Sequence, residues 1–198
     1  MLQAVPHGVY PEGFDTPELM MRILIRLMAG LALVAVLLVC VGWFLPARYA
    51  VSRTVMFASP PEKIWPLIES PREWARWTVW NQRDPAMKMR YSGAERGAGA
   101  AWAWESHSEG NGRMTFTAAD APRRLAYRLE FPDFEGGTNT GELLLVPDGK
   151  GTRVTWSMQG EMGGNPILRW FGLLMDRMVG PDFDGGLARL RTLADSAT

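Results

Sequence analysis

Residues that perform acid–base chemistry near neutral pH are scarce in this 198-residue chain. His107, Glu105 and Glu109 stand close together at the end of one expected strand, and such groups are typical general acids or bases. Strand parity places His107 with Glu105 and opposite Trp102 and Trp104. We therefore interpret the histidine and both carboxylates as solvated residues beside a turn, and we assign no catalytic residue.

Other polar residues indicate positioning rather than catalysis. Tyr127 is the one residue with a hydroxyl on the inward face of the expected strands, so it either orients a polar group of a ligand or satisfies a buried partner. Asn81, Arg83 and Asp84 follow a run of tryptophans; they line an entrance or form an ordinary polar loop, and we favour the loop. The sequence contains no metal-ligand spacing, serine triad or phosphate-binding loop, so we expect neither a metal nor another cofactor.

Charge and cysteine content narrow the classes of partner. The 21 basic and 21 acidic residues balance without a long run of one sign, so we expect no nucleic-acid partner. Cys40 is the only cysteine and lies in an apolar stretch, which excludes an intramolecular disulfide and a cysteine-rich zinc site.

Aromatic residues are the strongest chemical signal, because nine tryptophans exceed what a core of this size needs. Aromatic walls with adaptable methionines suit a flat or lipidic guest, whereas plain core packing is the alternative for each residue taken singly. We predict an apolar ligand pocket lined by Trp77, Trp80, Trp102, Trp104, Met114, Phe116, Tyr127, Leu129, Trp156, Met158, Trp170 and Met175.

The secondary-structure elements that position these residues begin at Val51, where apolar residues recur at every second position. Residues 51–57 alternate in the manner of a strand. The segment 59–62 (SPPE) predicts the start of a short helix, and Pro71 predicts a second one with Trp74 and Trp77 on one face. Further strands are expected at residues 87–91, 101–107, 113–117, 124–131, 138–146 and 152–158.

Turns and a C-terminal helix complete this pattern. Glycine-rich turns are expected at residues 110–112 and 148–151. Asn165 begins a helix whose apolar residues keep a 3.6 period over 167–178, with a kink at Gly180-Pro181 before the period resumes. A sheet and a helix with one apolar face each bury those faces together, so we predict an α+β domain with a curved antiparallel sheet around a long helix.

A long apolar stretch precedes this domain. Residues 27–45 contain no charge, amide or proline, and as a helix they would span roughly 28 Å, close to the ~30 Å core of a bilayer. We predict a transmembrane helix over residues 22–46. Residues 1–21 carry prolines and glycines without an apolar period and are expected to form a disordered tail.

The topology of this span stays open. Arg22 and Arg26 on one side nearly balance Arg48, Arg53 and Lys63 on the other. A signal peptide is the competing interpretation, but its apolar region would be shorter and small residues would precede a cleavage site. We therefore expect an uncleaved anchor.

The order of strand, two short helices, about six strands and a long C-terminal helix resembles the START and Bet v 1-like (SRPBCC) superfamily, in particular its bacterial polyketide cyclase/dehydrase branch. The segments that carry the likeness are 58–65 (ASPPEKIW), the tryptophans at 74, 77 and 80, 151–160 (GTRVTWSMQG) and 176–190 (DRMVGPDFDGGLARL). The resemblance implies a helix-grip fold over residues 49–195 that encloses an apolar ligand between sheet and helix. It also implies a single-pass protein of a bacterial inner membrane, with the side of the domain left open.

Three functions remain possible on this basis. The first is a membrane-anchored binding module that holds or shuttles a hydrophobic small molecule or lipid. The second is a polyketide cyclase/dehydrase-like enzyme acting on such a molecule, and the third is a protein-interaction module. Because no ionisable residue is expected to face the cavity, the sequence favours binding over catalysis.

Overall fold

Helix α1 (Thr16–Phe44) opens the part of the chain that our computed structural model describes, which is residues 16–133 and 137–196. The chain divides into two compact units, residues 1–41 and 42–198. Over Leu19–Phe44, α1 is long and apolar enough to be a membrane span or a signal sequence. The helix includes residues 16–21, which we had expected in the disordered tail; the rest of that tail lies outside the described residues. Pro17 stands at the second helical position, where its missing N–H costs no hydrogen bond.

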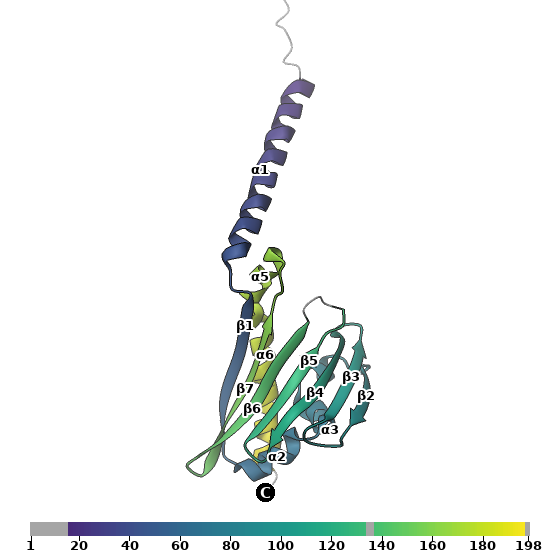
Figure 1. Ribbon diagram of the computed structural model, residues 1–198, viewed down its shortest axis with the longest axis vertical. Helices are drawn as coiled ribbons and strands as arrows, with labels where there is room; N and C mark the ends of the chain where they lie inside the picture. The colour runs from purple at the N-terminus through teal and green to yellow at the C-terminus, as the bar shows by residue number, and fades with distance from the viewer. Residues whose placement is uncertain (1–15, 134–136, 197–198) are drawn as a thin grey trace, which may run out of the picture. The chain divides into compact units, whose positions relative to one another are not determined.

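The second unit contains a seven-stranded antiparallel sheet in the order β1-β7-β6-β5-β4-β3-β2, and Figure 1 shows its strands curving around the long helix α6. This arrangement confirms the predicted fold class. The strands are β1 (Arg48–Phe57), β2 (Lys88–Gly93), β3 (Ala100–Ser106), β4 (Gly110–Asp120), β5 (Arg124–Glu130), β6 (Thr138–Asp148) and β7 (Gly151–Glu161).

Period-two alternation places the apolar side chains on the concave face. In β5, Leu125, Tyr127 and Leu129 are buried while Arg124 and Arg128 are exposed, as the sequence predicts. The turn between β3 and β4 differs from the prediction, because it occupies residues 107–109 rather than 110–112. Gly110 adopts a φ of 72° directly after this three-residue loop, which only glycine accepts at little cost.

Short helices cover part of the concave face. Helices α2 (Pro61–Ile68) and α3 (Pro71–Trp77) follow β1 as expected, and a further short helix, α4 (Trp80–Arg83), comes after them. Ser59 makes no side-chain cap for α2; its hydroxyl donates to the Ala194 carbonyl (2.9 Å) and so fastens the end of α6.

The C-terminal helical region is broken at Leu173-Leu174, between α5 (Pro166–Gly172) and α6 (Met175–Ser196), and α6 continues as one helix through Gly180-Pro181, where the sequence predicts a kink. Arg53 of β1 pairs with two carboxylates of α6. Its guanidinium binds Asp176 (Nη1–Oδ1, 2.7 Å) and Asp184 (Nε–Oδ2, 3.1 Å), one on each side of Pro181. The hydrogen bond with Asp176 is the main cause that raises the pKa of Arg53, and it lowers the pKa of the Asp176 carboxyl.

The apolar side chains of the two helical parts differ in burial. Phe183, Leu187 and Leu190 of α6 are buried in the core, as expected. The predicted face of residues 167–178 is only partly buried: Ile167, Phe171, Leu174 and Met178 are exposed, whereas Leu168, Trp170 and Met175 are half-buried. The 3.6 period correctly predicted helix there, and of that face Met175 packs against the core of the domain.

The core centres on Trp156 of β7. Its ring stacks on Phe183 of α6 with centroids 3.9 Å apart and planes 2° from parallel, and it meets Trp74 and Trp77 of α3 edge-on. A Cβ at Gly186 would lie 2.9 Å from the Trp156 ring, so glycine there allows α6 to approach the sheet closely.

Gly141 provides a test of this packing. It lies opposite Tyr127 on β5 and Met158 on β7, and an added Cβ would overlap the Tyr127 ring and the Ser157 carbonyl oxygen. We expect Gly141→Ala to lower the free energy of unfolding by about 1–3 kcal/mol, as overpacking does. Chemical denaturation of the full chain in detergent measures this. Gly164→Ala, where nothing lies within 4 Å of an added Cβ, is the matched control, and equal loss in both variants would contradict the packing.

Candidate functional site

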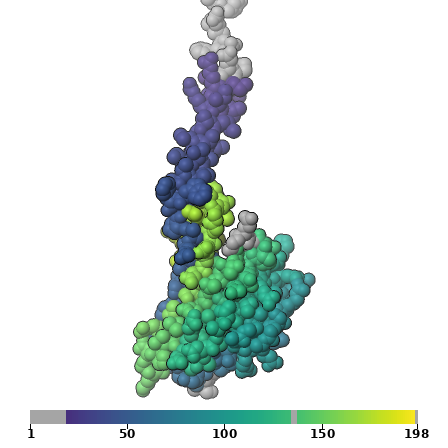
Figure 2. Space-filling model, in the orientation of Figure 1, coloured from purple at the N-terminus to yellow at the C-terminus, as the bar shows by residue number. Residues whose placement is uncertain are grey.

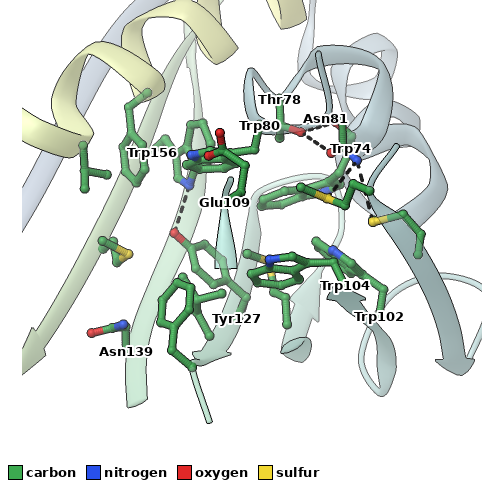
Figure 3. Close-up of a pocket in the computed structure, with 18 of the residues that line it drawn as sticks. Trp74, Thr78, Trp80, Asn81, Trp102, Trp104, Glu109, Tyr127, Asn139 and Trp156 are labelled. Carbon is green, nitrogen blue, oxygen red and sulfur yellow. Dashed lines mark hydrogen bonds between the residues drawn. The ribbon is translucent and has the colours of Figure 1, made fainter. Parts of the chain in front are cut away.

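A cavity of about 180 Å³ lies between the concave face of the sheet and helices α3, α4 and α6 (Figure 3). Its walls come from almost every element of the domain. The lining residues are Tyr49, Trp74, Thr78, Trp80, Asn81, Met87, Met89, Trp102, Trp104, Glu109, Met114, Tyr127, Leu129, Phe131, Asn139, Trp156, Met158, Met175, Val179 and Phe183.

The inner wall is aromatic. Five aromatic residues of this wall are buried: Trp74, Trp102, Tyr127, Trp156 and Phe183. The Trp74 ring contacts three of the others, because its centroid lies 5.5–5.7 Å from those of Trp102, Tyr127 and Trp156. Rings in tilted and edge-to-face contact pack favourably and keep their positions. This wall offers a rigid apolar surface to any guest.

The partly exposed lining residues mark the rim, and the strand register places the rim at one end of the sheet. Tyr49 lies at the start of β1, Trp104 near the end of β3, and Glu109 in the turn before β4. Antiparallel pairing brings the starts of β1, β4 and β6 to the same end as the ends of β3, β5 and β7. The start of α6, with Met175 and Val179, borders the same rim.

Two tyrosine hydroxyls face the cavity, and both have protein partners. The Tyr127 hydroxyl donates to the Ser157 carbonyl (3.0 Å) and accepts from Trp156 Nε1 (2.9 Å). Burial raises the pKa of Tyr127 strongly, so its phenol stays neutral. Tyr49, which the sequence analysis missed because β1 begins before residue 51, donates to Asn139 Oδ1 (2.6 Å). Burial raises its pKa also.

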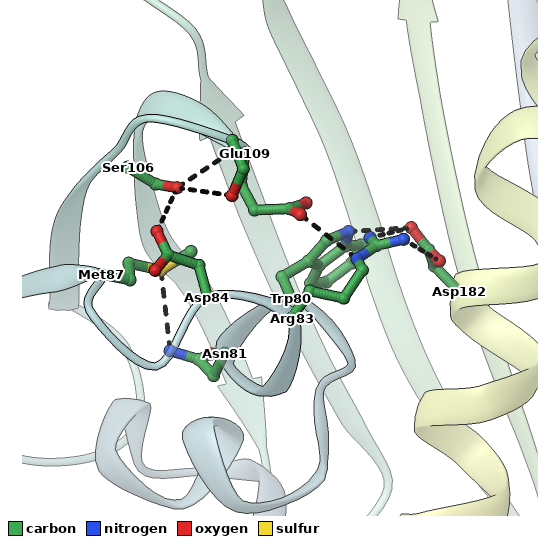
Figure 4. Close-up of polar contacts among 9 residues, drawn as sticks. Trp80, Asn81, Arg83, Asp84, Met87, Ser106, Glu109 and Asp182 are labelled. Atoms are coloured by element: carbon green, nitrogen blue, oxygen red, sulfur yellow. Dashed lines mark hydrogen bonds and ion pairs between the residues drawn. The ribbon is translucent and has the colours of Figure 1, made fainter.

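One carboxylate faces the cavity, contrary to the expectation that no ionisable group does so. Glu109 lines the wall with its side chain only 17% exposed, because the turn at 107–109 directs it inward rather than to solvent. Arg83 Nε lies 3.2 Å from Glu109 Oε1, and Arg83 also forms a two-bond pair with Asp182 of α6 (3.0 and 2.7 Å; Figure 4). The hydrogen bonds to Asp182 are the main cause that raises the pKa of Arg83.

This network fastens α4 to α6 at the rim. Trp80 Nε1 donates to the same Asp182 carboxylate (2.9 Å), so one carboxylate receives an indole and a guanidinium (Figure 4). Asn81 lines the cavity, whereas Asp84 accepts from the hydroxyl of Ser106 (2.6 Å), the last residue of β3. The favoured interpretation of Asn81 as an ordinary loop residue is therefore wrong.

The remaining candidates for acid–base chemistry lie away from the cavity. His107 is exposed in the turn, and Glu105 is exposed and pairs with Arg90 on the neighbouring strand. Across residues 16–133 and 137–196, no group of three His, Cys, Asp or Glu side chains is arranged to hold a metal ion.

Nine residues predicted for the pocket line the cavity: Trp80, Trp102, Trp104, Met114, Tyr127, Leu129, Trp156, Met158 and Met175. Trp77 and Phe116 lie in the solid core instead, and Trp170 does not line the cavity. Trp74 lines the cavity although it was not predicted for the pocket. The sequence placed Trp74 and Trp77 on the same helix face and did not show which indole borders the cavity.

A curved sheet closed by a long helix over an apolar cavity defines the helix-grip, Bet v 1-like class of ligand-binding modules. Residues 48–195 match the model of the family described as polyketide cyclase / dehydrase and lipid transport, and the chain belongs to this family. No curated protein matches the chain.

Solved structures share this fold at low identity. Protein MLL2253 from Mesorhizobium loti matches with a TM-score of 0.54 at 17% identity, over 75% of this chain and 98% of its own. A Thermobifida fusca protein matches with a TM-score of 0.56 at 20% identity, over 73% and 92%. Ara h 8.0201 matches with a TM-score of 0.50 at 11% identity, over 74% and 97%. These likenesses concern the fold alone.

The Tyr127 hydroxyl can be tested as a structural group. Tyr127→Phe leaves the Trp156 N–H and the Ser157 carbonyl without this partner, so we expect the free energy of unfolding to fall by about 1–3 kcal/mol. Tyr91→Phe, on β2 and outside the cavity lining, is the matched control and should be near neutral. Denaturation curves that leave Tyr127→Phe as stable as wild type would show that the hydroxyl has no structural role.

Proposed function

We propose that this protein is a membrane-anchored binding module that holds or shuttles a hydrophobic small molecule or lipid in the cavity between sheet and helix. The observation that carries this proposal is an apolar cavity whose polar groups are largely engaged by the protein itself. Tyr49, Tyr127 and Glu109 each bind a protein partner, so the cavity offers a guest mostly aromatic and aliphatic contact.

Cavity size supports a small guest or the apolar part of a larger one. About 180 Å³ is comparable to the engineered cavity of about 150 Å³ that binds benzene. The flexible methionines at 87, 89, 114, 158 and 175 can widen the space by changing rotamer. We therefore infer a ligand with one or two rings or a short acyl segment.

Anchoring by α1 brings this cavity close to the bilayer in our proposal. Only residues 45–47 separate α1 from β1, so the start of β1 stays near the point where a spanning helix would leave the membrane. The rim of the cavity lies at that same end of the sheet. A ligand that is poorly soluble in water would then have a short path between lipid and cavity.

A bound ligand can be detected directly. We expect native mass spectrometry of the full chain, extracted gently from membranes, to show an apolar adduct that is displaced on unfolding. Leu129→Trp fills the cavity and should lower occupancy by about tenfold or more, the equivalent of ~1.4 kcal/mol. Met114→Phe, a smaller increase in volume, serves if Leu129→Trp does not fold.

Val146→Trp is the matched control, because Val146 is exposed near the opposite end of β6. It should retain the adduct at wild-type occupancy. A folded wild-type protein without any apolar adduct, or equal loss in the control, would contradict the binding proposal.

A cyclase- or dehydrase-like reaction is the second candidate, and the inward position of Glu109 favours it. A carboxylate beside an apolar cavity can accept a proton from a bound molecule. The ion pair with Arg83 instead holds Glu109 in a structural role, which is why we place binding first. Under the binding proposal, Glu109→Gln retains the adduct and the adduct's mass is stable on incubation. Loss of one water from the adduct in wild type but not in Glu109→Gln would establish the enzyme instead.

A further inference from the structure

Exposed apolar side chains occur on α5, in the turn that follows it and on the first turn of α6. We call this set the stripe; it consists of Ile167 and Phe171 of α5, Leu174 of the turn and Met178 of α6. Phe171 is 52% exposed and Met178 59% exposed. A stripe of this kind on a water-facing surface is unfavourable unless something apolar covers it.

An adjacent face of the same segment borders the cavity. Met175 and Val179 contribute to the rim, whereas the exposed Leu174 and Met178 do not line it. The stripe is therefore not part of the core that would close on a ligand. It belongs to the outer face of the helix that borders the cavity.

Hydrogen bonds hold α5 against the last residues of α1, which belong to the same unit as the sheet. Arg169 Nη1 donates to the carbonyls of Trp43 (2.9 Å) and Leu45 (3.3 Å), where a helix end leaves carbonyls unpaired. The Arg169 guanidinium also lies over the Trp43 ring, 5.5 Å from its centroid. Met162 N–H donates to the Ala47 carbonyl (2.8 Å).

Close packing makes this attachment tight. A Cβ at Gly42 would overlap the Pro166 carbonyl oxygen, so the start of α5 touches the end of α1 directly. In Figure 2 the yellow-green atoms of α5 stand at the surface beside the blue atoms where α1 ends. Trp43 and Phe44 are exposed there too, which extends the apolar surface from α5 to the helix end.

We propose that the stripe of Ile167, Phe171, Leu174 and Met178 docks on the lipid bilayer, at the boundary between headgroups and acyl chains. This inference rests on the proposed membrane anchoring by α1. Because α5 is fixed to the residues at which α1 would leave the bilayer, the stripe lies at interfacial depth, where apolar side chains and tryptophan are stabilised.

The docking gives α6 a specific role in ligand passage. Its first turn presents Met178 to the membrane and Met175 and Val179 to the rim, so one helical turn separates lipid from cavity. A ligand would enter beside this turn without crossing bulk water.

Fluorescence quenching in nanodiscs tests the docking on the full chain. In a Cys40→Ala background, a polarity-sensitive label is attached to Met178→Cys, and in the control to Val146→Cys, which is 42% exposed near the other end of the sheet. Lipids carrying a nitroxide near the headgroup should quench the Met178→Cys label about twofold or more relative to the control, as expected for insertion into the interface. Leu174→Cys provides a second label in case Met178→Cys does not fold.

Each other outcome overturns the inference in a distinguishable way. Equal quenching at both positions, in protein that resists carbonate extraction, would contradict the docking proposal but not the membrane anchor. A label that is shielded from aqueous iodide yet not quenched by lipid nitroxide assigns the stripe to a second copy. Release of the protein by carbonate refutes the anchor itself, and the docking with it.

Discussion

The stack of Trp156 on Phe183 sets the distance between the sheet and α6, and the cavity depends on that distance. The two rings lie 3.9 Å apart and almost parallel, and Gly186 leaves room for the indole beside the helix. The Trp156 N–H is bound by Tyr127, so the ring cannot rotate without breaking a buried hydrogen bond. Trp156 and Phe183 both line the cavity, which lies beside their stack between the sheet and α6.

The polar groups of the site are committed to protein partners, and this is why we propose binding rather than catalysis. The Tyr127 hydroxyl both donates and accepts within the wall, and Tyr49 is committed to Asn139. Glu109, the one carboxylate among the lining residues, is held by Arg83, which is itself held by Asp182. These groups hold the rim and the wall in place. In our proposal a bound guest therefore contacts mainly the aromatic rings and the methionine thioethers of the lining.

Sequence patterns predicted the parts of the fold that depend on local periodicity. The alternation in β5 placed Tyr127 and Leu129 inward because side chains of a strand alternate strictly. Periodicity did not locate the break between α5 and α6 or the turn at 107–109. Arg53 bridges Asp176 and Asp184 across Pro181, and no local signal reveals that pairing.

The wrong predictions for the site follow from the misplaced turn and from the limits of helical periodicity. Moving the turn by three residues changed Glu109 from a solvated residue to a wall residue. The helical period of residues 167–178 predicted an apolar face correctly, but periodicity does not identify what the face contacts. Trp74 and Trp77 show the same limit of periodicity. Their spacing predicts that they share one helix face, but it does not predict which of them borders the cavity.

The claim that the cavity takes an apolar guest is tested most directly by the indole N–H resonances of the ¹⁵N-labelled full chain in nanodiscs, titrated with benzene. Our account predicts saturable shifts for Trp102, Trp104 and Trp156, which line the cavity, and none for Trp65, which does not line it and whose indole donates to Glu69. Unchanged cavity resonances, or equal and non-saturable shifts at Trp65, would contradict it.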